Sequence, residues 1–284
     1  MVSPNFMEES PPRRAVLLVA AAALLWSSGG LFIKVAPMPG LAVACGRAVV
    51  ATLFYLAVLR PDLRKARFTT ALAYAGCVVT FVTATKLTTA ANAIFLQYTG
   101  PAYVLLLSPF VLGEPFRPLD GICVLLSLAG MSLFFVDKLE VGQLAGNLLA
   151  TSSGVFFAFT VLFLRRDAKQ GSGDAIPSTT LGNVLAALGT APFAGALLHV
   201  STVGALVLLY LGVMQLGVSY WMFARGVRRV PAAEASLISM LEPVCNPLWV
   251  LLGTGERPGP WSVVGGAVVL GAVALRTLIV SPRP

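Results

Sequence analysis

Charged side chains are scarce in this chain. Asp, Glu, Lys and Arg make up 11% of its 284 residues, and hydrophobic residues make up 57%. Soluble domains carry about 25% charged residues, and a surface that faces water on all sides cannot be built from so few charges. The composition therefore excludes an ordinary soluble domain and predicts a membrane protein.

Residues on which many enzymes and metal sites depend are also few. The chain has one histidine, His199, and its four cysteines lie in apolar stretches without metal-ligand spacing. It contains no HExxH sequence and no phosphate-binding GxxxxGK[ST] loop. We therefore expect no enzyme, no bound metal or cofactor, and no ATP hydrolysis as a source of energy.

Long apolar runs, in contrast, recur along the whole chain. A helix needs about 20 apolar residues to cross a hydrocarbon layer of ~30 Å, and the runs do not alternate as the strands of a membrane barrel would. We predict an all-α membrane protein with ten transmembrane helices. The expected spans are 15–34, 40–59, 69–87, 90–112, 118–136, 144–164, 177–198, 203–224, 232–253 and 259–280.

The positive charges predict how these helices are oriented. Fifteen of the 20 Lys and Arg residues fall on one side if the N-terminus lies in the cytoplasm, four fall on the other, and Arg47 lies within the second span. Positive charge concentrates on the cytoplasmic side of membrane proteins, so both termini are predicted to be cytoplasmic. The same bias explains the net charge of +8, and we expect no nucleic-acid partner.

The two halves of the chain resemble each other. Residues 90–118 read AANAIFLQYTGPAYVLLLSPFVLGEPFRP and residues 232–260 read AAEASLISMLEPVCNPLWVLLGTGERPGP, so that a shift of 142 aligns Pro101 with Pro243 and Gly113-Glu114 with Gly255-Glu256. We predict two five-helix repeats, 15–136 and 144–280, joined by a linker at 137–143 and flanked by tails at 1–14 and 281–284. Because five is odd, the second repeat is inverted relative to the first, as in many secondary transporters.

These paired segments, together with LLWSSGGLFIK in the first span, resemble the EamA-type, ten-helix members of the drug/metabolite transporter superfamily. The resemblance covers nearly the whole chain and is strongest to the bacterial aromatic amino-acid exporters. It implies export of amino acids or similar small metabolites across the inner membrane, by alternating access through a central cavity. The chain departs from symmetry where Asn92 and Gly100 correspond to Glu234 and Glu242.

Glu242 is the most informative residue for a binding site. It lies about ten residues into the ninth span, where a lipid-facing charge would cost at least ~2.5 kcal/mol. Pro243 removes a backbone donor and frees a carbonyl near Ser239, and Pro101 beside Gly100 does the same near Gln97. Broken helices at membrane depth line cavities or are buried in protein, so we expect the two breaks to mark the centre of the site and to take part in gating.

Helical spacing and composition supply the remaining candidates. The predicted substrate-binding residues are polar or aromatic and lie inside spans: Trp26, Gln97, Tyr98, Tyr103, Gln215, Trp221, Ser239, Glu242 and Asn246. The predicted helix-break residues are Gly100, Pro101 and Pro243, and Arg47 is the candidate partner for the charge of Glu242.

Several alternatives stay open at the level of sequence. The prolines could serve only to bend helices, and Arg47 could extend to the outer surface or cap carbonyls instead of meeting Glu242. Glu242 could exchange a proton, pair with Arg47, or serve packing alone. The protein could be a membrane scaffold or receptor without transport activity, or it could carry another solute class such as drugs or nucleotide-linked metabolites. The sequence is compatible with a monomer in the lipid bilayer.

Overall fold

The computed structural model describes residues 11–134, 143–170, 175–254 and 260–280. Residues 137–142 of the predicted linker, the C-terminal tail and most of the N-terminal tail lie outside these residues, as do Gly255 and Glu256 of the second repeat. All regular secondary structure of the described residues is helical, and these residues contain no strand, which confirms the all-α prediction.

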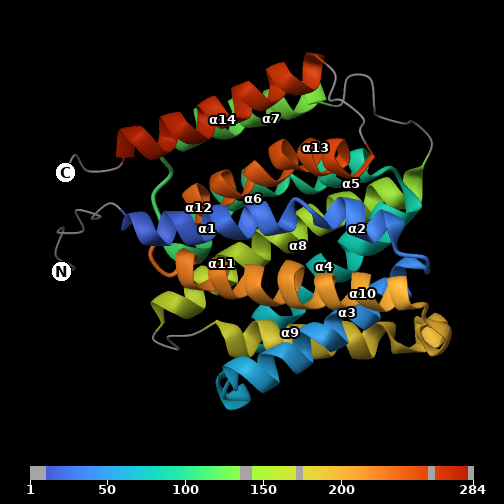
Figure 1. Ribbon diagram of the computed structural model, residues 1–284. Coiled ribbons are helices and arrows are strands. Elements are labelled where there is room, and N and C mark those ends of the chain that lie inside the picture. Colours follow the sequence, from blue (N-terminus) through green and yellow to red (C-terminus); the bar gives the residue numbers. More distant parts are fainter. Residues whose placement is uncertain (1–10, 135–142, 171–174, 255–259, 281–284) are drawn as a thin grey trace.

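The helices form one bundle in which they run approximately parallel or antiparallel to a common axis (Figure 1). Those of the first half are α1 (Arg13–Trp26), α2 (Gly29–Val35), α3 (Gly40–Phe54), α4 (Phe68–Leu87), α5 (Ala90–Gln97), α6 (Gly100–Leu112) and α7 (Pro118–Phe134). Those of the second half are α8 (Leu144–Lys169), α9 (Ile176–Thr190), α10 (Thr202–Tyr210), α11 (Ser219–Val227), α12 (Ala232–Ser239), α13 (Leu241–Thr254) and α14 (Pro260–Val280).

Four shorter helical segments adjoin these helices. Two are π-helical turns, η1 (Tyr55–Leu59) and η4 (Leu211–Val218), and two are 3₁₀ turns, η2 (Leu63–Lys65) and η3 (Ala191–His199). The segment η4 joins α10 to α11 without a break, so Thr202–Val227 is one continuous helical stretch.

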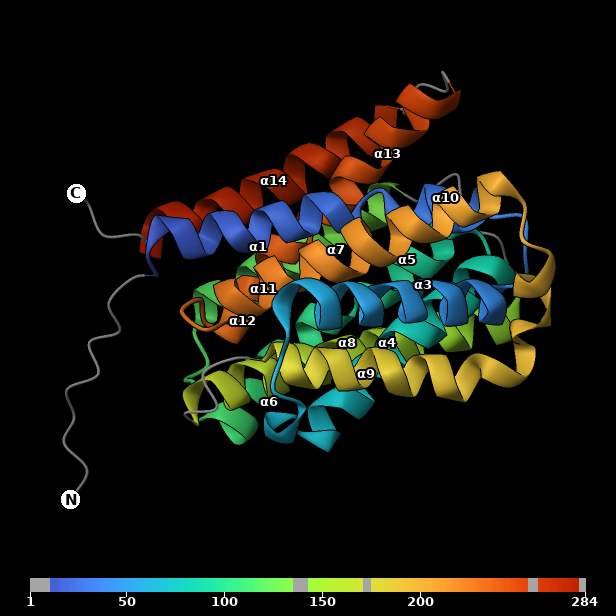
Figure 2. The same cartoon turned by 60° about the horizontal axis from the view of Figure 1, so that its bottom comes forward.

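Helices occupy all ten of the predicted spans. Among the described residues, seven stretches are long and apolar enough to cross a membrane, and parts of α7 and α14 are shorter apolar helices. The remaining crossings stay predictions. Helices α4 and α8 pack against each other inside the bundle, whereas α7 and α14 pair along its edge. The described chain ends, where α1 begins and α14 ends, lie at the same end of the bundle (Figures 1 and 2).

Three of the spans are interrupted in the middle. The helix breaks between α5 and α6 and between α12 and α13 lie where Pro101 and Pro243 predicted them. A third break, between α1 and α2, falls at Ser27 and Ser28 and was not predicted. There each serine hydroxyl donates to a carbonyl of the preceding turn, Ser27 to Leu24 and Ser28 to Leu25, which competes with the regular helical hydrogen bonds.

Gly100 and Gly154 allow two backbones to approach closely. A Cβ at Gly100 would lie 2.9 Å from the carbonyl oxygen of Gly154, and a Cβ at Gly154 would lie 2.7 Å from the carbonyl oxygen of Gln97. Small residues permit such contacts between membrane helices. The two glycines therefore fix the break between α5 and α6 against α8.

Substitution of Gly154 by alanine should destabilise the protein by about 1–3 kcal/mol, the usual cost of overpacking, and lower its unfolding temperature in detergent. The matched control is Gly189→Ala in α9, where no atom lies within 4 Å of the new methyl group. That variant should be neutral or up to ~1 kcal/mol more stable, since alanine favours a helix over glycine. Equal effects of the two substitutions would contradict this packing.

Glu114 joins several helices at the end of the bundle where α1 begins. Its carboxylate accepts from Arg165 Nε at 2.8 Å, lies 2.9 Å from Lys169 Nζ, and accepts from the backbone N–H of Ala232, the first residue of α12, at 3.0 Å. Arg165 also donates to the carbonyls of Val227 and Arg228 at the end of α11. One ion pair thus satisfies the start of one helix and the end of another.

The ion pairs of Glu114, which lies in the turn after α6, make the stability of the protein depend on the charge of this carboxyl. Burial disfavours the ionised carboxyl, but Arg165, Lys169 and the Ala232 N–H outweigh it, so that the pKa of Glu114 is held below its ordinary value. A carboxyl whose pKa is lower in the folded than in the unfolded protein stabilises the folded protein at pH values above its unfolded-state pKa of about 4.3. This stabilisation is lost as the pH falls through the folded-state pKa.

Glu114→Gln should therefore be less stable than the parent at pH 7, by about 3 kcal/mol, because it removes one partner of a buried ion pair. Below pH ~4.3 the difference should shrink, since the parent then loses the same charge. Unfolding temperatures measured from pH 7 to pH 3 test this. The exposed residue Asp62 provides the control, and Asp62→Asn should be as stable as the parent at pH 7. A difference between Glu114→Gln and its parent that stays constant with pH would contradict the assignment.

Candidate functional site

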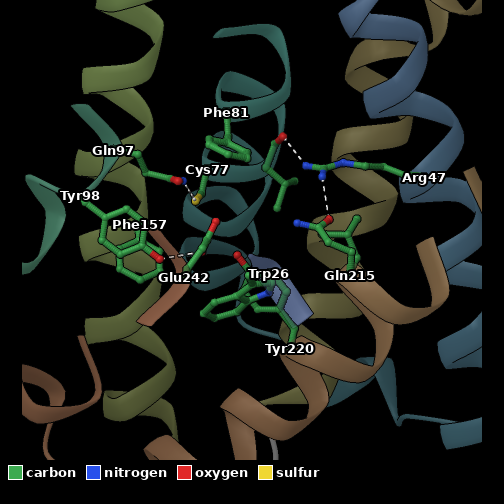
Figure 3. A pocket seen from close by; sticks show the side chains of 12 residues that line it. Trp26, Arg47, Cys77, Phe81, Gln97, Tyr98, Phe157, Gln215, Tyr220 and Glu242 are labelled. Carbon is green, nitrogen blue, oxygen red and sulfur yellow. Dashed lines mark hydrogen bonds between the residues drawn. The ribbon is translucent and has the colours of Figure 1, made fainter. Parts of the chain in front are cut away.

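A small cavity lies where the helix breaks meet the centre of the bundle (Figure 3). Its walls come from both halves of the chain. They consist of Trp26, Arg47, Cys77, Val78, Phe81, Gln97, Tyr98, Phe157, Gln215, Leu216, Tyr220 and Glu242. Six of these residues, Trp26, Arg47, Gln97, Tyr98, Gln215 and Glu242, are candidates that the sequence nominated.

The acidic wall of the cavity is built around Glu242, which is 6% exposed. Its Oε2 lies 2.6 Å from the hydroxyl oxygen of Tyr98, and that hydroxyl lies 2.9 Å from the carbonyl oxygen of Ser239. Pro243 has no N–H to offer the Ser239 carbonyl. The proline break thus leaves an acceptor that Tyr98 reaches from the other half of the chain.

The basic wall is built around Arg47 on α3, which is 1% exposed. Its guanidinium donates to Gln215 Oε1 at 2.9 Å and to the Val78 carbonyl at 2.7 Å. The third nitrogen, Nε, has no hydrogen-bond partner among the described residues. Both acceptors of Arg47 are neutral, so its positive charge is not compensated by them.

Gln215 owes its position to local backbone geometry. It lies in the π-helical segment η4, and a Cβ at Gly29, at the start of α2, would be 2.7 Å from its Nε2. Tyr55 donates toward the carbonyls of Leu216 and Gly217 in the same segment. A π-helical turn widens the helix and is frequently found at functional sites.

Arg47 and Glu242 face the same cavity without forming an ion pair, since Glu242 meets Tyr98 and Arg47 meets Gln215 and Val78 (Figure 3). The predicted direct pairing is therefore absent from the described structure. The alternative in which Arg47 extends to the surface is also wrong, because the side chain is buried. Two buried ionisable groups of opposite sign instead lie on opposite walls.

Aromatic rings enclose the space between these walls. The ring centroid of Trp26 lies 4.8 Å from that of Tyr220 and 6.3 Å from that of Phe157. Trp26 is 4% exposed, and its Nε1–H has no hydrogen-bond partner among the described residues. On the opposite side of the cavity Gln97 donates to the Ser153 hydroxyl at 2.9 Å. The cavity therefore has a largely aromatic surface, and two residues of its wall, Trp26 and Arg47, each keep one buried N–H without a partner among the described residues.

The other nominated residues do not line the cavity. Tyr103 is half-buried on α6, and the Trp221 ring lies under the guanidinium of Arg225 at 4.3 Å. Ser239 contributes its carbonyl, while its hydroxyl donates to the Ala235 carbonyl. Asn246 faces α2, where a Cβ at Gly30 would lie 3.5 Å from its Nδ2. Gly100, Pro101 and Pro243 lie at the helix breaks beside the cavity.

Sequence reasoning did not nominate six residues of the cavity wall: Cys77, Val78, Phe81, Phe157, Leu216 and Tyr220. Five of them look like ordinary core residues of apolar helices, and no signal in the sequence separates them from the core. Tyr220 is an aromatic residue inside a predicted span, like its neighbour Trp221, and the sequence alone does not show which of the two lines a cavity. No group of three potential metal ligands occurs in the described part of the chain.

The cavity measures about 30 Å³. A water molecule needs roughly 10–15 Å³ of such space, so about two waters would fill it, whereas pockets for drug-sized ligands measure roughly 300–1,000 Å³. The described conformation is therefore closed, and any larger ligand requires the helices around the breaks to separate.

Family comparison decides what kind of protein contains this cavity. A model described as the EamA-like transporter family matches residues 13–136 and again residues 144–278. The chain belongs to the EamA-like transporter family. It is thus a multi-pass membrane protein of a family that transports small solutes.

Individual relatives agree with this assignment. The chain is 27% identical over 199 residues to an uncharacterized transporter of Archaeoglobus fulgidus, covering 70% of this chain and 71% of the relative. It is 29% identical over 168 residues to the uncharacterized transporter YwfM of Bacillus subtilis, covering 57% of this chain and 54% of that protein. A solved crystal structure covers 94% of this chain and 97% of its own chain with a TM-score of 0.77 and 22% identity, which establishes likeness of fold alone.

Alanine substitutions distinguish residues of the cavity wall from nominated residues outside it. Trp26→Ala, Gln97→Ala or Gln215→Ala should change the apparent affinity for a transported solute by about tenfold or more, equivalent to ~1.4 kcal/mol. Tyr103→Ala and Trp221→Ala, whose side chains lie outside the cavity, should change it less than about twofold. Solute uptake into proteoliposomes at matched protein content measures this. If both groups behave alike at equal folded yield, the cavity is not the site.

Proposed function

We propose that this EamA-like protein is a secondary transporter that exports amino acids, with aromatic amino acids preferred, through the central cavity. The observation that carries the proposal is the opposition of Arg47 and Glu242 across one buried cavity. An amino acid bears a carboxylate and an ammonium group close together, and it would offer a counter-charge to each wall.

Electrostatic cost supports this interpretation. A buried ionic group without a partner is expensive, and Arg47 meets only two neutral acceptors. A substrate carboxylate would compensate its charge and could use the free Nε–H of Arg47, with the free Nε1–H of Trp26 as a further donor. A substrate ammonium group would then lie toward Glu242 on the opposite wall.

The remaining walls favour an aromatic side chain. Trp26, Phe81, Tyr98, Phe157 and Tyr220 provide ring faces and edges around the cavity. Aromatic rings pack on one another with a gain of about 0.5–1.5 kcal/mol beyond the burial of area. The resemblance of the sequence to aromatic amino-acid exporters points to the same substrate class.

The transport cycle proposed here uses two inverted repeats. The repeats span 15–136 and 144–280 and place both termini in the cytoplasm of a bacterial-type cell, in the inner membrane, where one monomer functions within the lipid. The breaks at Gln97–Gly100 and Ser239–Leu241 correspond under the shift of 142, and they provide hinge points around a closed cavity. Inverted repeats that exchange conformations open one central site to each side in turn.

Counterflow of radiolabelled phenylalanine in proteoliposomes, with an inhibitor panel, tests the proposal. Phenylalanine should compete at least about tenfold better than phenethylamine, which lacks the carboxylate, or 3-phenylpropionate, which lacks the ammonium group. Arg47→Gln should lower the apparent affinity for phenylalanine by roughly 30-fold or more (about 2 kcal/mol) but leave the apparent affinity for phenethylamine unchanged. Glu242→Gln should lower the apparent affinity for phenylalanine and leave the apparent affinity for 3-phenylpropionate unchanged.

Arg64→Gln serves as the control because Arg64 is an exposed arginine, and it should behave like the parent. Binding of amino acids without counterflow would indicate a receptor instead of a transporter. Inhibition by apolar drugs but not by amino acids would assign the cavity to another solute class.

A further inference from the structure

The hydroxyl of Tyr98 lies between two oxygen atoms that both require a hydrogen. It is 2.9 Å from the Ser239 carbonyl oxygen and 2.6 Å from Glu242 Oε2. A tyrosine hydroxyl has a single hydrogen to donate. One of the two contacts must therefore obtain its hydrogen from elsewhere.

Of the two oxygen atoms, the Ser239 carbonyl oxygen depends more on the Tyr98 hydrogen. The residue four positions later is Pro243, which has no N–H, and a buried carbonyl without a donor is costly. A carbonyl cannot donate, whereas a carboxyl can, if it is protonated. The arrangement that satisfies all three oxygens has Tyr98 donating to Ser239 and a protonated Glu242 donating to Tyr98.

The groups around Glu242 are consistent with a neutral carboxyl. The titratable or charged side chains that line the cavity with it are Arg47 from α3, Cys77 from α4, Tyr98 from the end of α5, and Tyr220 from α11. Only Arg47 is a cation, and it is directed to Gln215 and Val78. Of the helices that pack on α13, α1 brings the non-titrating Trp26, and α2 brings Lys34, which donates to the Thr88 carbonyl at 2.9 Å. Glu234 of α12 and Arg276 of α14 lie 3.6 Å apart outside the cavity wall.

We propose that Glu242 is a proton-exchange site, at which one proton and the ammonium group of the substrate compete for the same carboxyl. This inference rests on the proposed function for its substrate and adds the coupling ion. In the closed, substrate-free conformation the carboxyl O–H bond is intact. When substrate binds, that bond breaks, the proton leaves to the side from which substrate entered, and the carboxylate binds the ammonium group, which keeps its own three hydrogens.

Competition at one carboxyl makes transport an exchange. After the substrate leaves on the far side, the carboxylate takes up a proton there and the tyrosine contact re-forms. One proton thus enters for each substrate that leaves, and export is driven by the inward proton gradient. With the membrane potential clamped, a gradient of one pH unit would support a tenfold concentration ratio of substrate, because one unit corresponds to 1.36 kcal/mol.

Two measurements test the proposal. In proteoliposomes with clamped potential and a one-unit pH gradient, the parent protein should accumulate phenylalanine up to about tenfold. Glu242→Gln, assayed above its own KM, should exchange phenylalanine but accumulate none. Tyr98→Phe keeps the carboxyl and should still accumulate substrate, although it removes the same hydroxyl contact. Equal accumulation by Glu242→Gln and the parent would overturn the coupling.

Infrared spectroscopy of substrate-free protein provides the second measurement, and it does not depend on the substrate. At neutral pH the parent should show a protonated carboxylic C=O band that shifts in deuterium oxide and is missing from Glu242→Gln. Identical spectra of the two proteins would overturn the proton site even if amino acids are transported. If the parent shows no counterflow of any amino acid, the proposed function fails, and this band still decides whether Glu242 holds a proton.

Discussion

One buried cation, Arg47, and one buried carboxyl, Glu242, kept apart across one cavity, are the constraint on which the rest of the structure depends. Arg47 and Glu242 are each at most 6% exposed, and taking an ion out of water costs several kcal/mol even after relaxation. A direct ion pair between them would offset part of that cost. The protein instead gives each group its own polar neighbours, and this leaves the space between them available for a ligand with both charges.

Local backbone irregularities make this separation possible. The break before Pro243 places a carbonyl within reach of Tyr98, and the π-helical segment η4 presents Gln215 to Arg47. Glycines then allow the irregular backbones to pack, Gly29 beside Gln215 and Gly154 beside the break after Gln97. Irregular backbone at membrane depth is tolerated only where protein or a water-filled cavity surrounds it. The position of the helix breaks and the position of the cavity therefore depend on each other.

Sequence reasoning predicted the helices and the two proline breaks because their signals are local. Apolar runs need only a length, and a proline removes a donor wherever it stands. Which side of a helix faces the cavity depends on how the helices pack, and this was harder to predict from the sequence. Tyr220 lines the cavity and Trp221 does not, because neighbouring residues of a helix with 3.6 residues per turn point in directions about 100° apart.

The same limit applies to other nominated residues. The break at Gly100 resets the helical phase, and Tyr103 then lies away from the cavity. Phe157 and Cys77 line the cavity only because α8 and α4 pack against each other beside it. The sequence does not distinguish such apolar residues from other core residues. The pairing of Arg47 with Glu242 was a reasonable hypothesis from depth alone, but depth does not determine which wall a side chain occupies.

A structure of the protein determined with bound phenylalanine tests the central claim most directly. We predict that the cavity enlarges, that the substrate carboxylate lies within hydrogen-bonding distance of Arg47, and that the ammonium group lies within hydrogen-bonding distance of Glu242, roughly 2.7–3.2 Å in each case. Phenylalanine bound elsewhere, or bound in the cavity with neither charged group in contact with these two side chains, would contradict it.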